Sequence, residues 1–432
     1  MDNKSQNTEI GGLLPRHVEP LLAEALESAR VVNLVGPRQA GKTTLVRDLL
    51  AEGRFVTLDN DVTRVSIESD PLGQLITLRT AAGAAPVIID EAQRLPSLAL
   101  AVKQIVDADR RPGQFLLTGS SNVFTTLAVA DSLAGRLSTC RLWPLSTAEI
   151  LSRKPSKLLD WAVGKSPELS ALPEPDSLTR DDYAERIVRG GYPEMHGLAF
   201  RARRSRLRAY LDTLVDRDVA DLLEIRRTDA LRRLIDQVAV RTGSVLNVSE
   251  LAGLVGVQRA TVDQWLDVLQ RLAVIVRVGA WASGETRREA GRPKIHMVDT
   301  GIASALRDLD TDSFQPDADP TALGGLLESF VFNELSRLCD LQENLFSIWH
   351  WTGPAQREID IVLESRWRLV TIEVKASTSI ARSDLKHLDW FANQGPGSGR
   401  QVTSLILYLG GEAVTLGRRR FALPVSILWA GR

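Results

Sequence analysis

Cysteine and histidine are scarce in this chain. Its two cysteines, Cys140 and Cys339, lack any pairing or metal-binding spacing, and its five histidines are scattered without the spacing of a zinc site. The sequence therefore gives no support to a disulfide scaffold or a zinc-dependent fold. Because unpaired cysteines suit a reducing compartment, we expect a cytoplasmic protein.

Long hydrophobic runs and an excess of either charge are also missing. No apolar segment approaches the roughly 20 residues of a membrane span, so we expect no membrane partner. Residues 1–7 are polar, so we expect no signal peptide. With 53 basic and 54 acidic residues the net charge is −1, which argues against a globally basic nucleic-acid binder but leaves local basic patches open. A length of 432 residues predicts about two to four domains.

The most informative segment that is present is a phosphate-binding loop. Residues 36–43 read Gly-Pro-Arg-Gln-Ala-Gly-Lys-Thr, a complete P-loop pattern between an apolar run at 31–35 and a helical pattern at 44–50. Backbone N–H groups of such a loop face bound phosphates, and the helix N-terminus adds partial positive charge. We expect Lys42 to reach the β- and γ-phosphates of ATP and Thr43 to ligate Mg²⁺. The predicted ATP-binding residues are Gly36, Pro37, Arg38, Gln39, Ala40, Gly41, Lys42, Thr43 and Thr44.

A pair of carboxylates ends a second apolar run. Val87, Ile88 and Ile89 are followed directly by Asp90 and Glu91. We expect Asp90 to hold Mg²⁺ through water and Glu91 to polarise the water that attacks ATP. Two such acids can also simply cap the next helix, but the upstream P-loop favours the catalytic interpretation.

The order of the elements predicts an α/β fold with a parallel sheet. Strands alternate with helices after residue 30, and the P-loop follows the first strand, so the nucleotide is expected at the carboxyl edge of the sheet. The expected strands are 31–35, 54–58, 86–90, 115–118 and 138–142, after a helix at 20–30.

The rest of the chain divides into further segments. We place the P-loop ATPase core at 1–143, a helical lid or connector at 144–243, a winged helix at 244–290 and an α/β domain at 291–432. Helices are expected at 201–225 and 229–242, and loops at 164–178 and 306–324.

Two features could contact DNA. Residues 247–278 predict a first helix, a turn at Val257 and Gln258, a second helix from Arg259 and a wing strand. The second helix offers few groove-reading side chains, so the pattern indicates a fold more than DNA binding. The densest basic run is Arg201, Arg203, Arg204, Arg206 and Arg208, which either contacts phosphates or forms a solvated helix.

Near the C-terminus, carboxylates and a lysine follow a nuclease-like spacing. Asp360 opens one strand, and Glu373 and Lys375 lie two residues apart on the next, so the latter two face the same side. A hairpin would bring Asp360 beside them, and Glu328 lies in a helix expected at 323–338. Such carboxylates hold Mg²⁺ or Mn²⁺, and a lysine can orient water. A plain salt bridge between Glu373 and Lys375 is the alternative.

Taken together, these stretches resemble a family of prokaryotic AAA-type ATPases. Its members join a P-loop domain to a winged helix and a restriction-endonuclease-like C-terminal domain of unassigned function. Besides the P-loop and the carboxylate motifs, the likeness is carried by residues 90–96, 117–121, 133–136, 190–193, 210–222, 297–301 and 372–375.

The resemblance implies further roles. Ser120, Ser121 or Asn122 would be the polar sensor near the γ-phosphate, and Arg136 would be an arginine finger offered to a neighbouring subunit, which implies a homo-oligomer. Arg189, Arg217 and Asp218 fall in family-like stretches without a defined role.

Two functions therefore compete. One is an oligomeric Mg²⁺-dependent ATPase that binds or remodels DNA and has a nuclease-like domain. The other is a nucleotide-dependent switch, in which the C-terminal half binds protein partners and the nuclease fold is inert.

Overall fold

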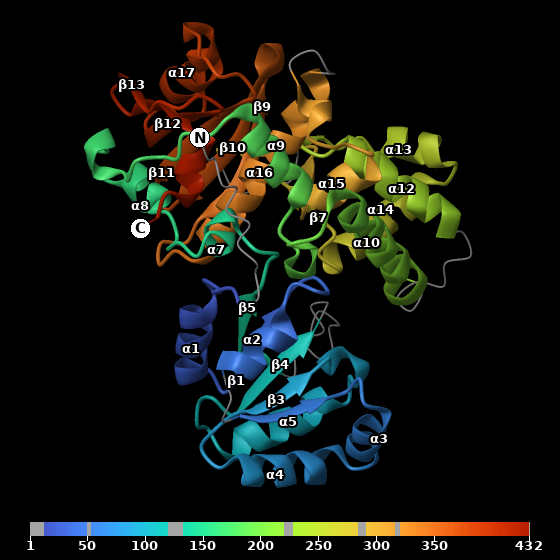
Figure 1. The fold of residues 1–432 in the computed structure, drawn as a ribbon. Helices are drawn as coiled ribbons and strands as arrows, with labels where there is room; N and C mark the ends of the chain where they lie inside the picture. The colour runs from blue at the N-terminus through green and yellow to red at the C-terminus, as the bar shows by residue number, and fades with distance from the viewer. Residues whose placement is uncertain are drawn as a thin grey trace, which may run out of the picture. The chain divides into compact units, whose positions relative to one another are not determined.

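A computed structural model describes residues 13–49, 53–119, 133–219, 228–283, 291–315 and 320–431. They form two compact units, shown in Figure 1. The P-loop unit comprises Arg16–Pro144 and Arg271–Ala273, and the C-terminal unit has Leu145–Gln270 and Val274–Arg432 as its bulk. Within the described ranges, no helix has both the length and the apolarity to cross a bilayer.

The P-loop unit is built on a parallel five-stranded sheet, which confirms the predicted α/β fold. The strand order is β2-β3-β4-β1-β5. The strands are β1 (Val31–Val35), β2 (Arg54–Thr57), β3 (Val87–Asp90), β4 (Phe115–Gly119) and β5 (Leu137–Arg141), each within a residue of its predicted bounds. Val35 lies beside Gly119, so the carboxyl ends of β1 and β4 meet at one edge.

Alternating strand residues bury both faces of this sheet. Ile88 and Leu116 pack with α1 (Glu19–Ser28) and α2 (Lys42–Leu49). Their neighbours Val87, Ile89, Phe115 and Leu117 face the other way, toward α3 (Asp61–Ser69), α4 (Pro71–Ala82) and α5 (Leu98–Ala108). Helices on both faces explain why the central strands are buried along their whole length and are mostly apolar.

Helices dominate the first part of the C-terminal unit. They are α7 (Thr147–Ile150), α8 (Leu158–Val163), α9 (Arg180–Arg189), α10 (Phe200–Thr213) and α12 (Thr228–Val240). A capping box fixes the start of α9, because Thr179 and Asp182 satisfy each other's backbone N–H groups. The helix expected at 201–225 begins as α10 and continues as a π-helical segment, Leu214–Val219, and residues 220–225 lie outside the described residues.

A helix pair and a small sheet lie where the helix-turn-helix pattern was found. The pair is α13 (Val248–Val255) and α14 (Arg259–Arg271), and Asn247 caps α13. The three-stranded sheet has the order β6-β8-β7, with β6 (Ser244–Val245), β7 (Ile275–Val278) and β8 (Lys294–Met297). This sheet crosses the domain boundary that the sequence places at residue 290.

A mixed six-stranded sheet completes the unit, with the order β13-β14-β12-β11-β10-β9. Its strands are β9 (Ser347–Gly353), β10 (Arg357–Ser365), β11 (Arg368–Lys375), β12 (Gln401–Tyr408), β13 (Val414–Gly417) and β14 (Arg420–Pro424). Leu388 and Phe391 of α17 (Lys386–Asn393) pack with residues of β10, β11 and β12. The other helices are α15 (Thr300–Leu306) and α16 (Pro320–Asp340), so the expected loop at 306–324 is shorter than predicted.

Candidate functional site

The P-loop adopts a backbone that its residue types explain. At Gly36, a Cβ atom would lie 2.0 Å from the carbonyl oxygen of Leu142, so any side chain there would clash with backbone. Gly41 has a φ of 96°, a conformation that side chains rarely allow. Gln39 also has a positive φ, of 60°. The glycines of the motif are thus required by the turn from β1 into α2.

Lys42 is buried inside this turn. Its Nζ donates to the carbonyl oxygens of Gly36 and Pro37 at 2.9 and 2.8 Å, and only 6% of the residue is exposed. Burial lowers the pKa of Lys42 to about 8, although the nearby carboxylates of Glu91 and Asp90 oppose this shift. The positive charge of Lys42 is therefore only partly balanced by the groups around it.

Thr43 and Asp90 lie together, as the sequence predicts for a Mg²⁺ site. Thr43 Oγ1 donates to Asp90 Oδ2 at 3.0 Å. Asp90 Oδ1 accepts from the hydroxyl of Thr118, the last residue but one of β4. Asp90 is 4% exposed, so these bonds fix its carboxylate at the carboxyl edge of the sheet.

Glu91 occupies a strained position beside Asp90. Its φ is 56°, in the left-handed region, which turns the chain sharply after β3. Gln93 donates from Nε2 to Glu91 Oε2 and orients the carboxylate. Burial raises the pKa of Glu91, and Lys42 and Arg38 oppose that effect.

The structure thus brings Lys42, Thr43, Asp90 and Glu91 together. Sequence reasoning missed Thr118, although it belongs to the 117–121 stretch. Asn122, like Ser120 and Ser121, lies outside the described residues.

Arg136 lies at the opposite edge of the sheet. It precedes β5, and its carbonyl oxygen accepts from the N–H of Val31 at 3.1 Å, at the amino end of β1. Its guanidinium binds Asp107 through two nitrogens, Nε at 2.5 Å and Nη2 at 2.9 Å. Arg136 is therefore remote from the phosphate loop of its own chain, and the arginine-finger role in trans stays a prediction.

The nuclease-like residues of the C-terminal unit also come together. Strands β10 and β11 are antiparallel, with Ile361 opposite Ile372, so Asp360 lies next to Glu373. Asp360 Oδ2 accepts from the N–H of Val374 at 2.9 Å. Glu373 pairs with Lys375 at 2.8 Å, the bond that the salt-bridge alternative predicts. Burial and the neighbouring Asp360 raise the pKa of Glu373 to about 7.

A lysine that sequence reasoning missed lies among these carboxylates. Lys294 of β8 is 1% exposed, and its ammonium contacts Glu328 at 2.9 Å, Glu358 at 2.7 Å and Asp360 at 3.3 Å. Burial, with Asp360 nearby, raises the pKa of Glu328 well above its ordinary value. The sequence does place Glu358 and Asp360 on one face of a strand, but it gives no sign that Lys294 is their partner.

This ammonium occupies the place of a cation. A divalent ion bound to Glu328 and Asp360 would have to displace a charge that already neutralises them. Among the described residues, no group of three or more Asp, Glu, His or Cys side chains is arranged to hold a metal ion. The metal site at Asp360 and Glu373 stays a prediction, and the position of Lys294 argues against it.

The basic run on α10 is largely engaged within the protein. Arg203 is buried, and Arg204 and Arg208 both pair with Asp308, at 3.0 and 2.9 Å. Arg201 and Arg206 are exposed. The run therefore offers fewer free cations to DNA than its composition indicates.

The P-loop unit matches a family model described as an AAA domain over residues 28–151, so the chain carries an AAA-type P-loop ATPase domain. Residues 180–313 match a domain of unknown function, DUF8612, and residues 323–428 match another, DUF4143.

The uncharacterised protein Rv2008c of Mycobacterium tuberculosis is 30% identical over 368 residues, which are 84% of this chain and 74% of that protein. The same values hold for Mb2031c of Mycobacterium bovis. The chain therefore belongs to the family of this mycobacterial protein.

Two solved structures show weaker similarity. The Walker-type ATPase paby2304 of Pyrococcus abyssi has a TM-score of 0.42 and 16% identity, covering 68% of this chain and 96% of that one. AMPPCP-bound DnaA of Aquifex aeolicus has a TM-score of 0.28 and 13% identity, covering 59% and 86%.

Proposed function

We propose that this protein hydrolyses ATP in a Mg²⁺-dependent reaction at the P-loop. The observation that carries the proposal is the chain of hydrogen bonds from Thr43 through Asp90 to Thr118, with Glu91 next to it. This donor set fits Mg²⁺, which would be held by Thr43 directly and by Asp90 through water. When bound, the ion would neutralise charge on the phosphates.

The residues of the loop would perform the remaining tasks. Backbone N–H groups of residues 36–44 would bind the phosphates. Lys42 would exchange its bonds to two loop carbonyls for the β- and γ-phosphates, which supply the negative charge that it lacks. Glu91, held by Gln93, would orient the attacking water and take its proton.

Substitution of Glu91 by Gln tests this assignment. The amide keeps the size of the side chain but cannot accept the proton, so ATP should stay bound while turnover falls by about 10²-fold or more. Binding is measured with a fluorescent ATP analogue and turnover by phosphate release. Glu68→Gln, an exposed site on α3, is the matched control and should behave as wild type. Wild-type turnover by Glu91→Gln would refute the assignment.

A second candidate is that DNA binding is coupled to this hydrolysis. A groove of about 990 Å³ in the C-terminal unit favours it. Its basic lining residues are Lys165, Arg400, Arg418, Arg419 and Arg420, and Glu168 is acidic. Arg418 and Lys165 are exposed, and within the described ranges Arg419 donates only to neutral oxygen atoms, so the groove retains positive charge. Guanidinium groups bind phosphates well.

DNA-stimulated ATPase activity and binding anisotropy with labelled duplex and single strands test this candidate. Arg418→Glu should weaken binding and reduce the slope of log affinity against log salt by about one unit. Lys386→Glu, an exposed lysine of α17 outside the groove, makes the same charge change and should alter neither quantity. Absence of DNA binding at low salt would instead favour the nucleotide-dependent switch.

Nuclease chemistry is not part of this proposal. The ammonium of Lys294 fills the position among Glu328, Glu358 and Asp360 where a metal cation would bind. This arrangement is consistent with a nuclease-like fold that has no nuclease activity.

A further inference from the structure

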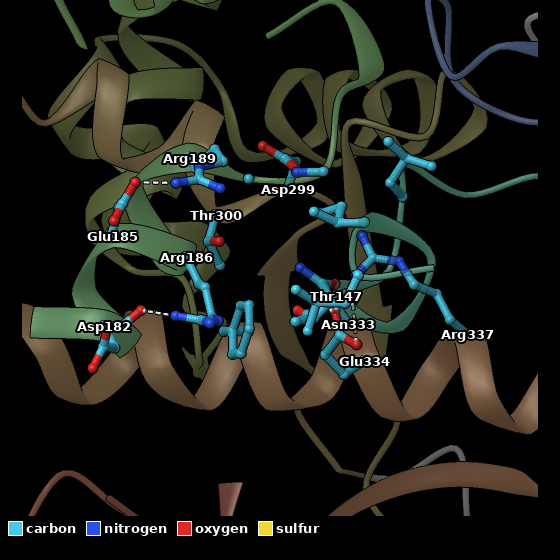
Figure 2. Close-up of a pocket in the computed structure, with 16 residues that line it drawn as sticks. Thr147, Asp182, Glu185, Arg186, Arg189, Asp299, Thr300, Asn333, Glu334 and Arg337 are labelled. Atoms are coloured by element: carbon cyan, nitrogen blue, oxygen red, sulfur yellow. Dashed lines mark hydrogen bonds and ion pairs between the residues drawn. The ribbon is translucent and has the colours of Figure 1, made fainter. Parts of the chain in front are cut away.

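A cavity in the C-terminal unit joins two sequence motifs that ATP hydrolysis does not use. Its volume is about 180 Å³. Gly190 and Gly191, after α9, lie in one motif, and Asp299 and Thr300, at the start of α15, lie in the other. α16 lines the cavity as well (Figure 2).

The two motifs are fitted closely to each other. Asp299 accepts from the N–H of Gly191 at 2.6 Å and from Ile302 at 3.0 Å. A Cβ atom at Gly190 would lie 2.3 Å from the Asp299 carboxylate, and one at Gly191 would lie 2.3 Å from the carbonyl of Leu145. Side chains are therefore excluded from both glycines, and the wall of the cavity is rigidly defined.

The carboxylates around the cavity already have donors. Glu334 accepts from Thr147 N at 3.1 Å and from Arg337 at 3.0 Å. The carboxylate of Asp182 accepts from the backbone N–H of Thr179 in the capping box of α9, and Glu185 forms an ion pair with Arg189. Asp299 accepts from backbone N–H groups, so each of these four carboxylates already has at least one donor within the protein.

In the part of the chain that the structure describes, the groups around the cavity that still lack a charged partner or an acceptor are N–H donors of two arginines, Arg186 and Arg337. Arg186 forms no ion pair among the described residues, and it donates to the carbonyl oxygen of Asp182 at 2.7 Å. Nε of Arg337 is buried, and the described part of the chain gives it no acceptor. Arg337 as a whole is 9% exposed. In Figure 2, Arg186 and Arg189 project from α9 on one side, and Arg337 projects from α16 on the other.

We propose that this cavity binds a small oxyanion, whose phosphate or carboxylate group is held by Arg186 and Arg337. A buried donor without an acceptor is unfavourable, and an anionic oxygen would satisfy it. Thr300 and Asn333 line the same cavity and could donate to further oxygens. The volume equals about six water molecules and is well below that of nucleotide or drug sites, so the ligand is of phosphate or short-carboxylate size.

Calorimetric titration of the full chain with inorganic phosphate tests the site, and succinate in a second arm distinguishes a carboxylate source. The P-loop is another phosphate site, so all proteins carry Lys42→Ala, and sodium chloride at equal ionic strength serves as the blank. Saturable binding is expected with at least one anion. Arg186→Gln should weaken it about tenfold or more, which corresponds to about 1.4 kcal/mol.

Arg206→Gln is the matched control, because Arg206 is exposed on α10 outside the cavity. Its affinity should equal that of the parent. If Arg186→Gln does not fold, Arg186→Lys keeps the charge but loses the planar fork, and its affinity should still fall. The proposal is overturned if neither anion binds saturably, or if the folded Arg186 variant binds as tightly as Arg206→Gln.

Discussion

At the scale of single residues, the two buried lysines Lys42 and Lys294 differ in their partners. Lys42 donates to neutral carbonyl oxygens, and burial lowers its pKa to about 8. Lys294 contacts three carboxylates, which raise its pKa above its ordinary value despite the opposing effect of burial. The first ammonium is available for a new anion, whereas the second is already neutralised.

The pKa of Lys42 predicts a pH dependence for ATP binding. Phosphates raise the pKa of a lysine that they contact, so above pH 8 the free protein must take up a proton when ATP binds. Affinity should be level below pH 8 and should fall by up to about tenfold per pH unit above it. Calorimetry at pH 7, 8 and 9, in buffers with different ionisation heats, measures both affinity and proton uptake. Lys42→Arg should bind without proton uptake, and a level profile in the wild type would contradict the prediction.

Lys294→Met is predicted to destabilise the C-terminal unit. It leaves Glu328, Glu358 and Asp360 close together without a cation, which costs about 3–5 kcal/mol at neutral pH. Protonation relieves the repulsion, so part of this loss should be recovered as the pH falls toward 5. Urea denaturation at pH 7 and 5 measures the effect.

Lys375→Met is the control, because that ammonium is half-buried and, among the described residues, forms an ion pair with Glu373 alone. Its loss of stability should be smaller than that of Lys294→Met. Mn²⁺ should not raise the melting temperature of the wild type through Asp360. If Mn²⁺ does raise it, and Asp360→Ala abolishes the increase, the predicted metal site at Asp360 is supported after all.

At the scale of elements, Arg419 attaches the β13–β14 hairpin to the end of α8 and to the residues that follow it. This side chain donates to Thr403 at 2.7 Å, to Ala162 and Lys165 at 3.0 Å and to Gly164 at 3.1 Å. Arg419 also has a φ of 57°, a conformation that glycine adopts more easily.

Arg419→Ala should therefore reduce the free energy of unfolding by about 1–3 kcal/mol, because several partly buried carbonyls lose their donor. Arg419→Gly loses the same bonds but relieves the backbone strain, so it should be the more stable of the two by about 1 kcal/mol. Denaturant unfolding of both variants separates the two effects. If Arg419→Ala matches wild type, the hairpin is attached by other contacts.

The sequence predicts elements better than it predicts long-range partners. The five strands of the P-loop unit follow from apolar runs, and the hairpin around Asp360 follows from the spacing of its carboxylates. Lys294 could not be assigned, because a single lysine in a short strand gives no sign of burial. The pairing of Arg136 with Asp107 is also hidden, because the two residues lie 29 positions apart and no local pattern links them.

At the scale of the whole molecule, assembly decides whether Arg136 can act in catalysis. In its own chain Arg136 lies at the amino edge of the sheet, whereas the P-loop follows the carboxyl end of β1. A neighbouring subunit would have to release Arg136 from Asp107, since that ion pair now holds the guanidinium. Asp107→Asn should therefore leave hydrolysis intact or raise it.

Mixing variants tests the arginine finger directly. Arg136→Ala should lower turnover by roughly 10³-fold or more, and Lys42→Ala should abolish it. Equal amounts of the two variants should regain activity, because an interface that joins an intact P-loop to an intact Arg136 has both groups. Phosphate release is measured across a range of protein concentrations, with light scattering to record assembly. Arg110→Ala, at an exposed arginine near the end of α5, is the control and should neither lose activity nor rescue Lys42→Ala. If a monomeric protein hydrolyses ATP at full rate, or if the mixture stays inactive although it assembles, Arg136 does not act in trans.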